Sequence, residues 1–131
     1  MLKSLFLFQA LVDIAFAIPL IFATTTVLAL YGLSTDRTGT FIAQFLGATF
    51  VILAWNSWYA RNWPDDENRR MLIRGAFIGS VAGFAAAINF QLGPGSTTAS
   101  WLFVVLTGIF VVGWGYFAYA TMQPMTRHQT A

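Results

Sequence analysis

Four long apolar stretches make up most of this 131-residue chain, and they leave it few ways to fold. They cover about residues 4–31, 38–60, 68–92 and 99–122, and each can cross a bilayer as a helix, which needs about 20 residues. Only 9% of the residues are charged, against about 25% in an ordinary soluble domain. The sequence therefore predicts an all-α protein with one integral membrane domain, residues 1–131, built as a bundle of four transmembrane helices.

Asp13 is the only acidic residue inside the first apolar stretch. It lies about 13 Å from the start of the predicted helix, at about 1.5 Å per residue. A carboxylate at the centre of a membrane helix costs roughly 2.5–3.5 kcal/mol on insertion scales, so neighbouring side chains are expected to stabilise it. Polar residues predicted in the same half of the membrane form a candidate intramembrane cluster: Asp13, Arg74, Asn56 and Gln9.

Two interpretations of this cluster stay open. In the first, Arg74 or Asn56 satisfies Asp13, and the cluster fixes how the helices align. In the second, Asp13 belongs to a proton- or cation-coupled site, because an ionisable residue inside a membrane helix is a candidate functional residue.

Pro19 lies inside the first predicted helix and predicts a kink, because proline removes one backbone hydrogen bond and presses on the carbonyl of Ala15. Thr24 is one of three threonines that can donate hydrogen bonds to the freed backbone. Gly32 is expected to end this helix, and Asp36 is a candidate N-cap for the next one.

Small residues recur every four positions in two of the predicted helices. The candidate packing stripes are Gly75, Gly79 and Gly83 in the third stretch, and Gly39, Ala43 and Gly47 in the second. Small residues at this spacing let the backbones of two membrane helices approach closely. The first stripe could pack against the second within one bundle, form a homodimer, or contact a larger partner.

Basic residues predict the orientation of the helices. Six of the seven Lys and Arg residues fall on the side shared by both termini and the loop near Arg61, and only Arg37 falls on the other. Because cytoplasmic loops are enriched in Lys and Arg, both termini are predicted to be cytoplasmic. Tryptophans are expected at the two membrane interfaces: Trp55, Trp58, Trp63, Trp101 and Trp114.

Several classes of function are disfavoured by composition. The chain has no cysteine, which excludes disulfides and Cys-based metal sites, and its one histidine, His128, lies in the C-terminal tail. No catalytic constellation or metal-ligand set occurs within a stretch, so we expect neither an enzyme nor a metalloprotein. Scattered basic residues argue against nucleic-acid binding. The 13 Phe, 5 Trp and 4 Tyr still allow a groove for a lipid, quinone or carotenoid.

Several segments, in their order along the chain, are similar to those of a loose group of uncharacterised small bacterial four-span inner-membrane proteins. They are Tyr31-Gly-Leu-Ser34, Phe45-Leu-Gly47, the segment from Ala54-Trp55 to Arg61, and Arg69-Arg70. The resemblance covers most of the chain and implies a bacterial inner-membrane location without any catalytic residue. An acid in the first of four spans also resembles small multidrug resistance transporters, by analogy only, because here the acid is Asp and the second loop is long and charged.

Three functions are therefore expected in order. The first is a non-enzymatic accessory or assembly subunit, in contact with membrane lipids and with other transmembrane helices in a hetero-complex or homo-oligomer. The second is a proton-coupled small-molecule transporter that uses Asp13. The third is a module that binds a quinone, carotenoid or other pigment.

Overall fold

The computed structural model describes residues 1–94 and 96–121, and these residues form helices without any strand. The helices are α1 (Leu2–Phe22), α2 (Thr24–Leu30), α3 (Arg37–Ala60), α4 (Glu67–Leu92) and α5 (Trp101–Ala120), with a single 3₁₀ turn, η1 (Thr98–Ser100), before α5. Four helical segments are long and apolar enough to span a membrane. The all-α fold with four membrane helices is confirmed, whereas Met122, Pro124 and His128 lie outside the described residues.

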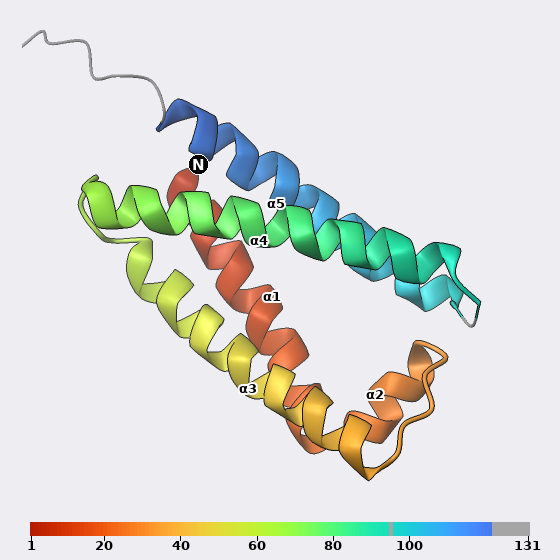
Figure 1. The fold of residues 1–131 in the computed structure, drawn as a ribbon. Coiled ribbons are helices and arrows are strands. Elements are labelled where there is room, and N and C mark those ends of the chain that lie inside the picture. Colours follow the sequence, from red (N-terminus) through yellow and green to blue (C-terminus); the bar gives the residue numbers. More distant parts are fainter. Residues whose placement is uncertain (95, 122–131) are drawn as a thin grey trace, which may run out of the picture.

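The four spanning helices are arranged as two pairs (Figure 1). α1 packs along α3, and α4 packs along α5. α3 and α4 are joined by the loop of residues 61–66 and diverge away from it, so the two pairs form an open V (Figure 1). α1 meets α5 at the narrow end of this V, where Phe6 packs on Trp114, and again toward the other end, where Phe16 and Tyr31 pack on Phe103.

Two aspartates are the N-cap residues of α3 and α4, the helices that diverge from the 61–66 loop. Asp36 caps α3, where its Oδ1 accepts a hydrogen bond from the backbone N–H of Gly39 at 2.8 Å. Asp66 caps α4 in the same way, accepting from the backbone N–H of Arg69 at 2.9 Å. These bonds satisfy N–H groups that a helix start otherwise leaves unpaired. Gly32 has a φ of 75°, which favours glycine, and it ends the α2 segment as expected.

The first predicted helix is interrupted, and the break differs from the predicted kink. Ala23 leaves the helical conformation, with φ −133° and ψ 37°, so that α2 becomes a separate seven-residue helix. The break lies after Pro19 rather than in the preceding turn, where the proline ring presses on Ala15. Thr24 donates its hydroxyl to the carbonyl of Leu20 at 2.5 Å, and this bond compensates the backbone at the break.

Close packing of α1 on α3 depends on Gly47. A Cβ atom at this position would lie 2.9 Å from Cγ1 of Ile21 and 3.2 Å from the backbone oxygen of Ala17. Ala43 is also buried, whereas Gly39 lies beside Thr35 and the Asp36 cap. The stripe of α3 therefore packs on α1 at Gly47, and not on α4.

The core lies at the narrow end of the V, beside the 61–66 loop. Phe6 of α1, Ile73 of α4 and Trp114 of α5 are each only 1% exposed, and Ala60, Phe110 and Ala118 complete the cluster. The rings of Phe6 and Trp114 meet edge to face, with centroids 4.8 Å apart. Trp114, expected at a membrane interface, is instead a core residue, because α1 covers its ring. The other four tryptophans of that set are exposed: Trp55, Trp58, Trp63 and Trp101.

Candidate functional site

A groove of about 680 Å³ lies between the two helix pairs, and we call it the central groove. All four spanning helices line it. Its apolar lining is rich in aromatic side chains: Phe6, Phe16, Phe50, Phe103, Phe110, Trp63 and Trp114. Its volume falls within the range of small-molecule sites, about 300–1,000 Å³, which are typically apolar with a few polar groups.

Among residues 1–94 and 96–121, Asp13 is the only ionisable one that lines the central groove. It lies near the middle of α1 and is 2% exposed. Its Oδ1 accepts a hydrogen bond from Nε2 of Gln9 at 2.8 Å, whereas its Oδ2 is buried without a hydrogen-bond partner among the described residues. A buried, unsatisfied acceptor costs about 1–3 kcal/mol, and more when it is charged. Asp13 therefore presents one acceptor oxygen that a donor from a ligand would stabilise.

Gln9 is positioned by a residue from another helix. Nε1 of Trp114 donates to Oε1 of Gln9 at 3.2 Å, and this bond leaves the amide N–H₂ group of Gln9 directed at Asp13. A chain of hydrogen bonds thus runs from α5 to α1 across the narrow end of the V. The amide orientation is therefore fixed at both ends, and Oδ1 is the oxygen of Asp13 that Gln9 satisfies.

The predicted polar cluster is only partly assembled. Gln9 contacts Asp13, as the spacing of four residues on one helix allows. Asn56 lines the same groove but has no hydrogen bond to Asp13. Arg74 instead donates to the backbone oxygen of Thr121 at 3.3 Å. The interpretation that Arg74 or Asn56 satisfies Asp13 is not supported, because α4 directs Arg74 toward the end of α5.

The glycine stripe of α4 forms one wall of the central groove. Gly75, Gly79 and Gly83 all line the groove. A Cβ at Gly75 or Gly79 would meet no other atom within 4 Å, and at Gly83 the nearest atom is Cγ2 of Thr107 at 3.6 Å. These glycines leave the groove wide instead of bringing α3 and α4 together.

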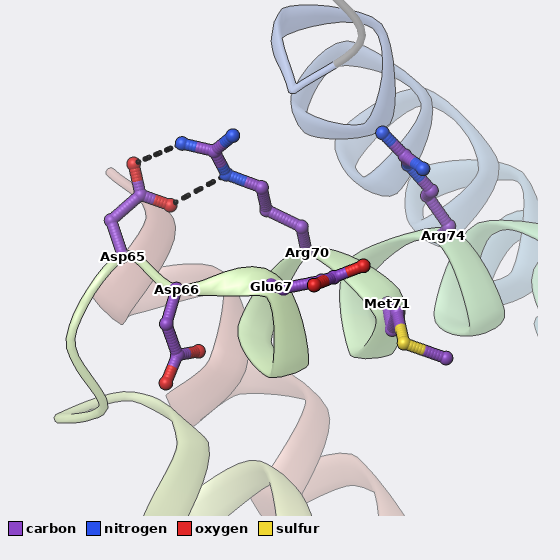
Figure 2. A pocket seen from close by; sticks show the side chains of 6 residues that line it. All are labelled: Asp65, Asp66, Glu67, Arg70, Met71 and Arg74. Atoms are coloured by element: carbon purple, nitrogen blue, oxygen red, sulfur yellow. Dashed lines mark hydrogen bonds and ion pairs between the residues drawn. The ribbon is translucent and has the colours of Figure 1, made fainter.

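A second hollow, of about 390 Å³, lies on the surface at the start of α4 (Figure 2). Asp65 and Arg70 form an ion pair there, with Nη2 and Oδ2 3.2 Å apart, and the Arg70 hydrogen bond lowers the pKa of Asp65. Asp66 is engaged in capping α4. Two of the three acids at this surface are therefore already used, and the hollow is a solvated mixed-charge loop lined by Asp65, Asp66, Glu67, Arg70, Met71 and Arg74.

Sequence reasoning identified Asp13, Gln9, Asn56 and the α4 glycines, but it missed the role of Trp114 and the aromatic lining. The contribution of Trp114 was hidden because its donor bond to Gln9 joins residues far apart in sequence. The aromatic lining carried no signal of its own, since lipid-facing phenylalanines look the same in a sequence. No group of three or more potential metal-ligating His, Cys, Asp or Glu residues occurs in the described part of the chain.

Comparison with known proteins adds no assignment. No family model, curated protein or solved structure matches this chain.

Proposed function

We propose that this protein is a non-enzymatic membrane carrier that binds one small amphiphilic molecule in the central groove, with Asp13 as its polar anchor. The observation that carries this proposal is the free acceptor oxygen of Asp13, which is buried in a groove of about 680 Å³ among apolar side chains. An apolar body would fill the aromatic part of such a groove, and a donor group would satisfy Asp13. This combination of shape and chemistry is typical of a small-molecule site.

Ligand binding is expected to be coupled to proton release, because the groove contains a single carboxyl group. A proton and a donor group of the ligand compete for the same Oδ2 atom, so binding of one favours release of the other. The other polar side chains that line the groove are neutral: Gln9, Asn56, Ser57, Asn68, Ser80, Thr107 and Trp114. Of the basic residues of α4, Arg74 donates to the carbonyl of Thr121, and the guanidinium of Arg69 lies 5.9 Å from the ring of Phe6, with a buried Nε that has no hydrogen-bond partner among the described residues.

Transport by purified protein in liposomes tests this function. A panel of labelled amphiphiles with cationic, neutral and anionic head groups would be offered under an imposed pH gradient. We expect pH-dependent uptake of at least one class, and Asp13→Asn should remove it. The matched control is Asp65→Asn, which removes an exposed acid outside the groove and should leave uptake unchanged. Uptake and pH dependence that survive in Asp13→Asn would refute the proposal.

The membrane location and the orientation are part of the proposal. The excess of Lys and Arg beside the termini and the 61–66 loop supports cytoplasmic termini, and the resemblance to small bacterial four-span proteins supports a bacterial inner membrane. Because the chain has no cysteine, single cysteines can be introduced at the exposed residues Ser34 and Asn62. A membrane-impermeant maleimide should label Ser34→Cys in intact cells and Asn62→Cys only after lysis. The reverse pattern would invert the orientation.

An accessory subunit of a larger membrane complex is the second candidate. The bare faces of Gly75 and Gly79 favour it, because a helix of a partner protein could pack there at short range. Gentle solubilisation from the native membrane, followed by native mass measurement, distinguishes the two. A fixed heteromeric assembly that is lost in Gly79→Leu but kept in the exposed control Ala85→Leu would favour the subunit. A single copy or a homo-oligomer with a bound small molecule would favour the carrier.

A further inference from the structure

We infer that the ligand of the central groove is a lipophilic amine, whose protonated head donates an N–H hydrogen bond to Oδ2 of Asp13. This inference rests on the proposed small-molecule site and names the chemical class of its ligand. Three observations carry it: the state of the Asp13 carboxyl, the aromatic lining and the bare wall of α4.

The carboxyl group selects the head of the ligand. Oδ1 is already satisfied by Gln9, and Oδ2 is buried without a hydrogen-bond partner among the described residues, so a ligand reaches it when the side chains around Asp13 shift. A head group that only accepts hydrogen bonds would leave Oδ2 unsatisfied, and an anionic head would be repelled. Hydrogen bonds with a charged partner are roughly twice as strong as neutral ones. An ammonium with at least one N–H therefore fits better than an alcohol, a carboxylate or a quaternary ammonium.

The rings that line the groove favour the same head group. Phe16 of α1 lies against Phe50 of α3 and Phe103 of α5, with ring centroids 6.3 and 5.5 Å apart. On the other side of Asp13 along α1, Phe6 and Trp114 pack together. Aromatic rings attract cations through their faces and also accept alkyl chains. A cationic head at Asp13 with an apolar body along these rings would satisfy both kinds of group.

The wall of α4 provides room for the body of the ligand. Gly75 and Gly79 line the groove with no atom within 4 Å of their Cβ positions. α3 and α4 diverge from their loop (Figure 1), which leaves a gap between these two helices for an amphiphile to enter from the bilayer. The first carbon of a larger side chain at Gly79 would meet no other atom within 4 Å, and the rest of the side chain would extend into the groove that Gly79 lines.

Binding of four twelve-carbon probes to the protein in lipid nanodiscs tests the inference. The probes are dodecylammonium, dodecyltrimethylammonium, dodecanol and dodecanoate, and the measurement is the saturable binding that exceeds binding to empty nanodiscs. We expect dodecylammonium to bind about tenfold tighter than dodecanol, because its hydrogen bond is charge-assisted. Dodecyltrimethylammonium should bind several-fold weaker than dodecylammonium because it has no N–H, and dodecanoate should show no saturable binding.

Variants separate the class of ligand from the existence of the site. Asp13→Asn should abolish the preference for dodecylammonium, whereas Asp65→Asn should keep it. Gly79→Leu should abolish saturable binding of every probe, and Ala85→Leu, on an exposed face of α4 outside the groove, should not. If dodecanol or dodecyltrimethylammonium binds as tightly as dodecylammonium, and Gly79→Leu still blocks this binding, the ligand is not specifically an amine. The small-molecule site in the groove would then still stand. Absence of saturable binding for all four probes, with only bulk lipid in the groove, would overturn both.

Discussion

Gln9 donates a hydrogen bond to Asp13 over 2.8 Å, one helical turn apart on α1, and this contact decides how the buried carboxyl is presented. Gln9 is itself held by Nε1 of Trp114. The carboxyl thus has one oxygen hydrogen-bonded to its own helix and one buried oxygen without a hydrogen-bond partner among the described residues. Gln9 therefore orients the Asp13 carboxyl, but no basic residue in the described part of the chain forms an ion pair with it. A carboxyl in this state can bind a donor group of a ligand.

Gln9→Ala should destabilise the protein, because it leaves both Oδ1 of Asp13 and the indole N–H of Trp114 without their partner. Each unsatisfied buried group costs about 1–3 kcal/mol, and we expect a loss of about 2 kcal/mol in the free energy of unfolding. Reversible unfolding in mixed detergent micelles measures it. Gln44→Ala is the control, since Gln44 is exposed and makes one 3.3 Å bond to a backbone oxygen. Similar losses for both variants would contradict the assigned network.

The same substitution at two glycines should have opposite effects. Gly75→Ala meets no atom within 4 Å and should stabilise α4 by up to about 1 kcal/mol through helix propensity. Gly47→Ala brings a methyl group within 3.2 Å of a backbone oxygen of α1, so α1 and α3 must separate. Overpacking of this kind costs about 1–3 kcal/mol. Unfolding of both variants in detergent measures the difference, and a stabilised Gly47→Ala would show that α1 and α3 pack less closely.

The number of spanning helices could be predicted from the sequence, because length and hydropathy are local properties, whereas the break at Ala23 could not. The cap at Asp36 was predictable because it depends on a few adjacent residues. The pairing of helices was not, because identical spacing of small residues gives close packing at Gly47 and an open wall at Gly75. Which helix a glycine contacts depends on the angle between the two helix pairs. The residue pattern within one helix carries no information about that angle.

Asp13 shows the same limit within the candidate site. Its cost in the membrane was predictable from its position alone, and Gln9 was visible one turn away. Arg74 was a reasonable partner by depth, but depth does not fix direction around a helix axis, and Arg74 lies toward Thr121 instead. The donor of Trp114 required a tertiary contact that only the fold reveals.

Trp114→Phe should lower stability more than the same change at Trp55. Trp114 is 1% exposed, packs on Phe6 and donates to Gln9, whereas Trp55 is 63% exposed. Phenylalanine keeps an aromatic ring but loses volume and the N–H donor, so we expect a loss of about 1–3 kcal/mol. Trp55→Phe should stay within about 0.5 kcal/mol. Chemical unfolding followed by far-UV circular dichroism measures both, and equal losses would place Trp114 outside the core.

The Asp65–Arg70 ion pair at the start of α4 should give a small, pH-dependent contribution to stability. The hydrogen bond from Arg70 lowers the pKa of Asp65 in the folded protein, below about 3.9 for a free aspartate. A group with a lowered pKa binds its proton more readily when unfolded, so the stabilisation is fully present above the unfolded pKa and disappears as the pH falls through the folded pKa. Because solvent screens this surface pair, its contribution is small. Carboxyl ¹³C NMR should show Asp65 titrating below its ordinary range, and Arg70→Gln should return it toward about 3.9. Arg37→Gln, which removes a basic residue beyond the other end of the V, is the control and should leave that titration unchanged. An Asp65 midpoint that Arg70→Gln does not move would show that the pair does not persist in the membrane protein.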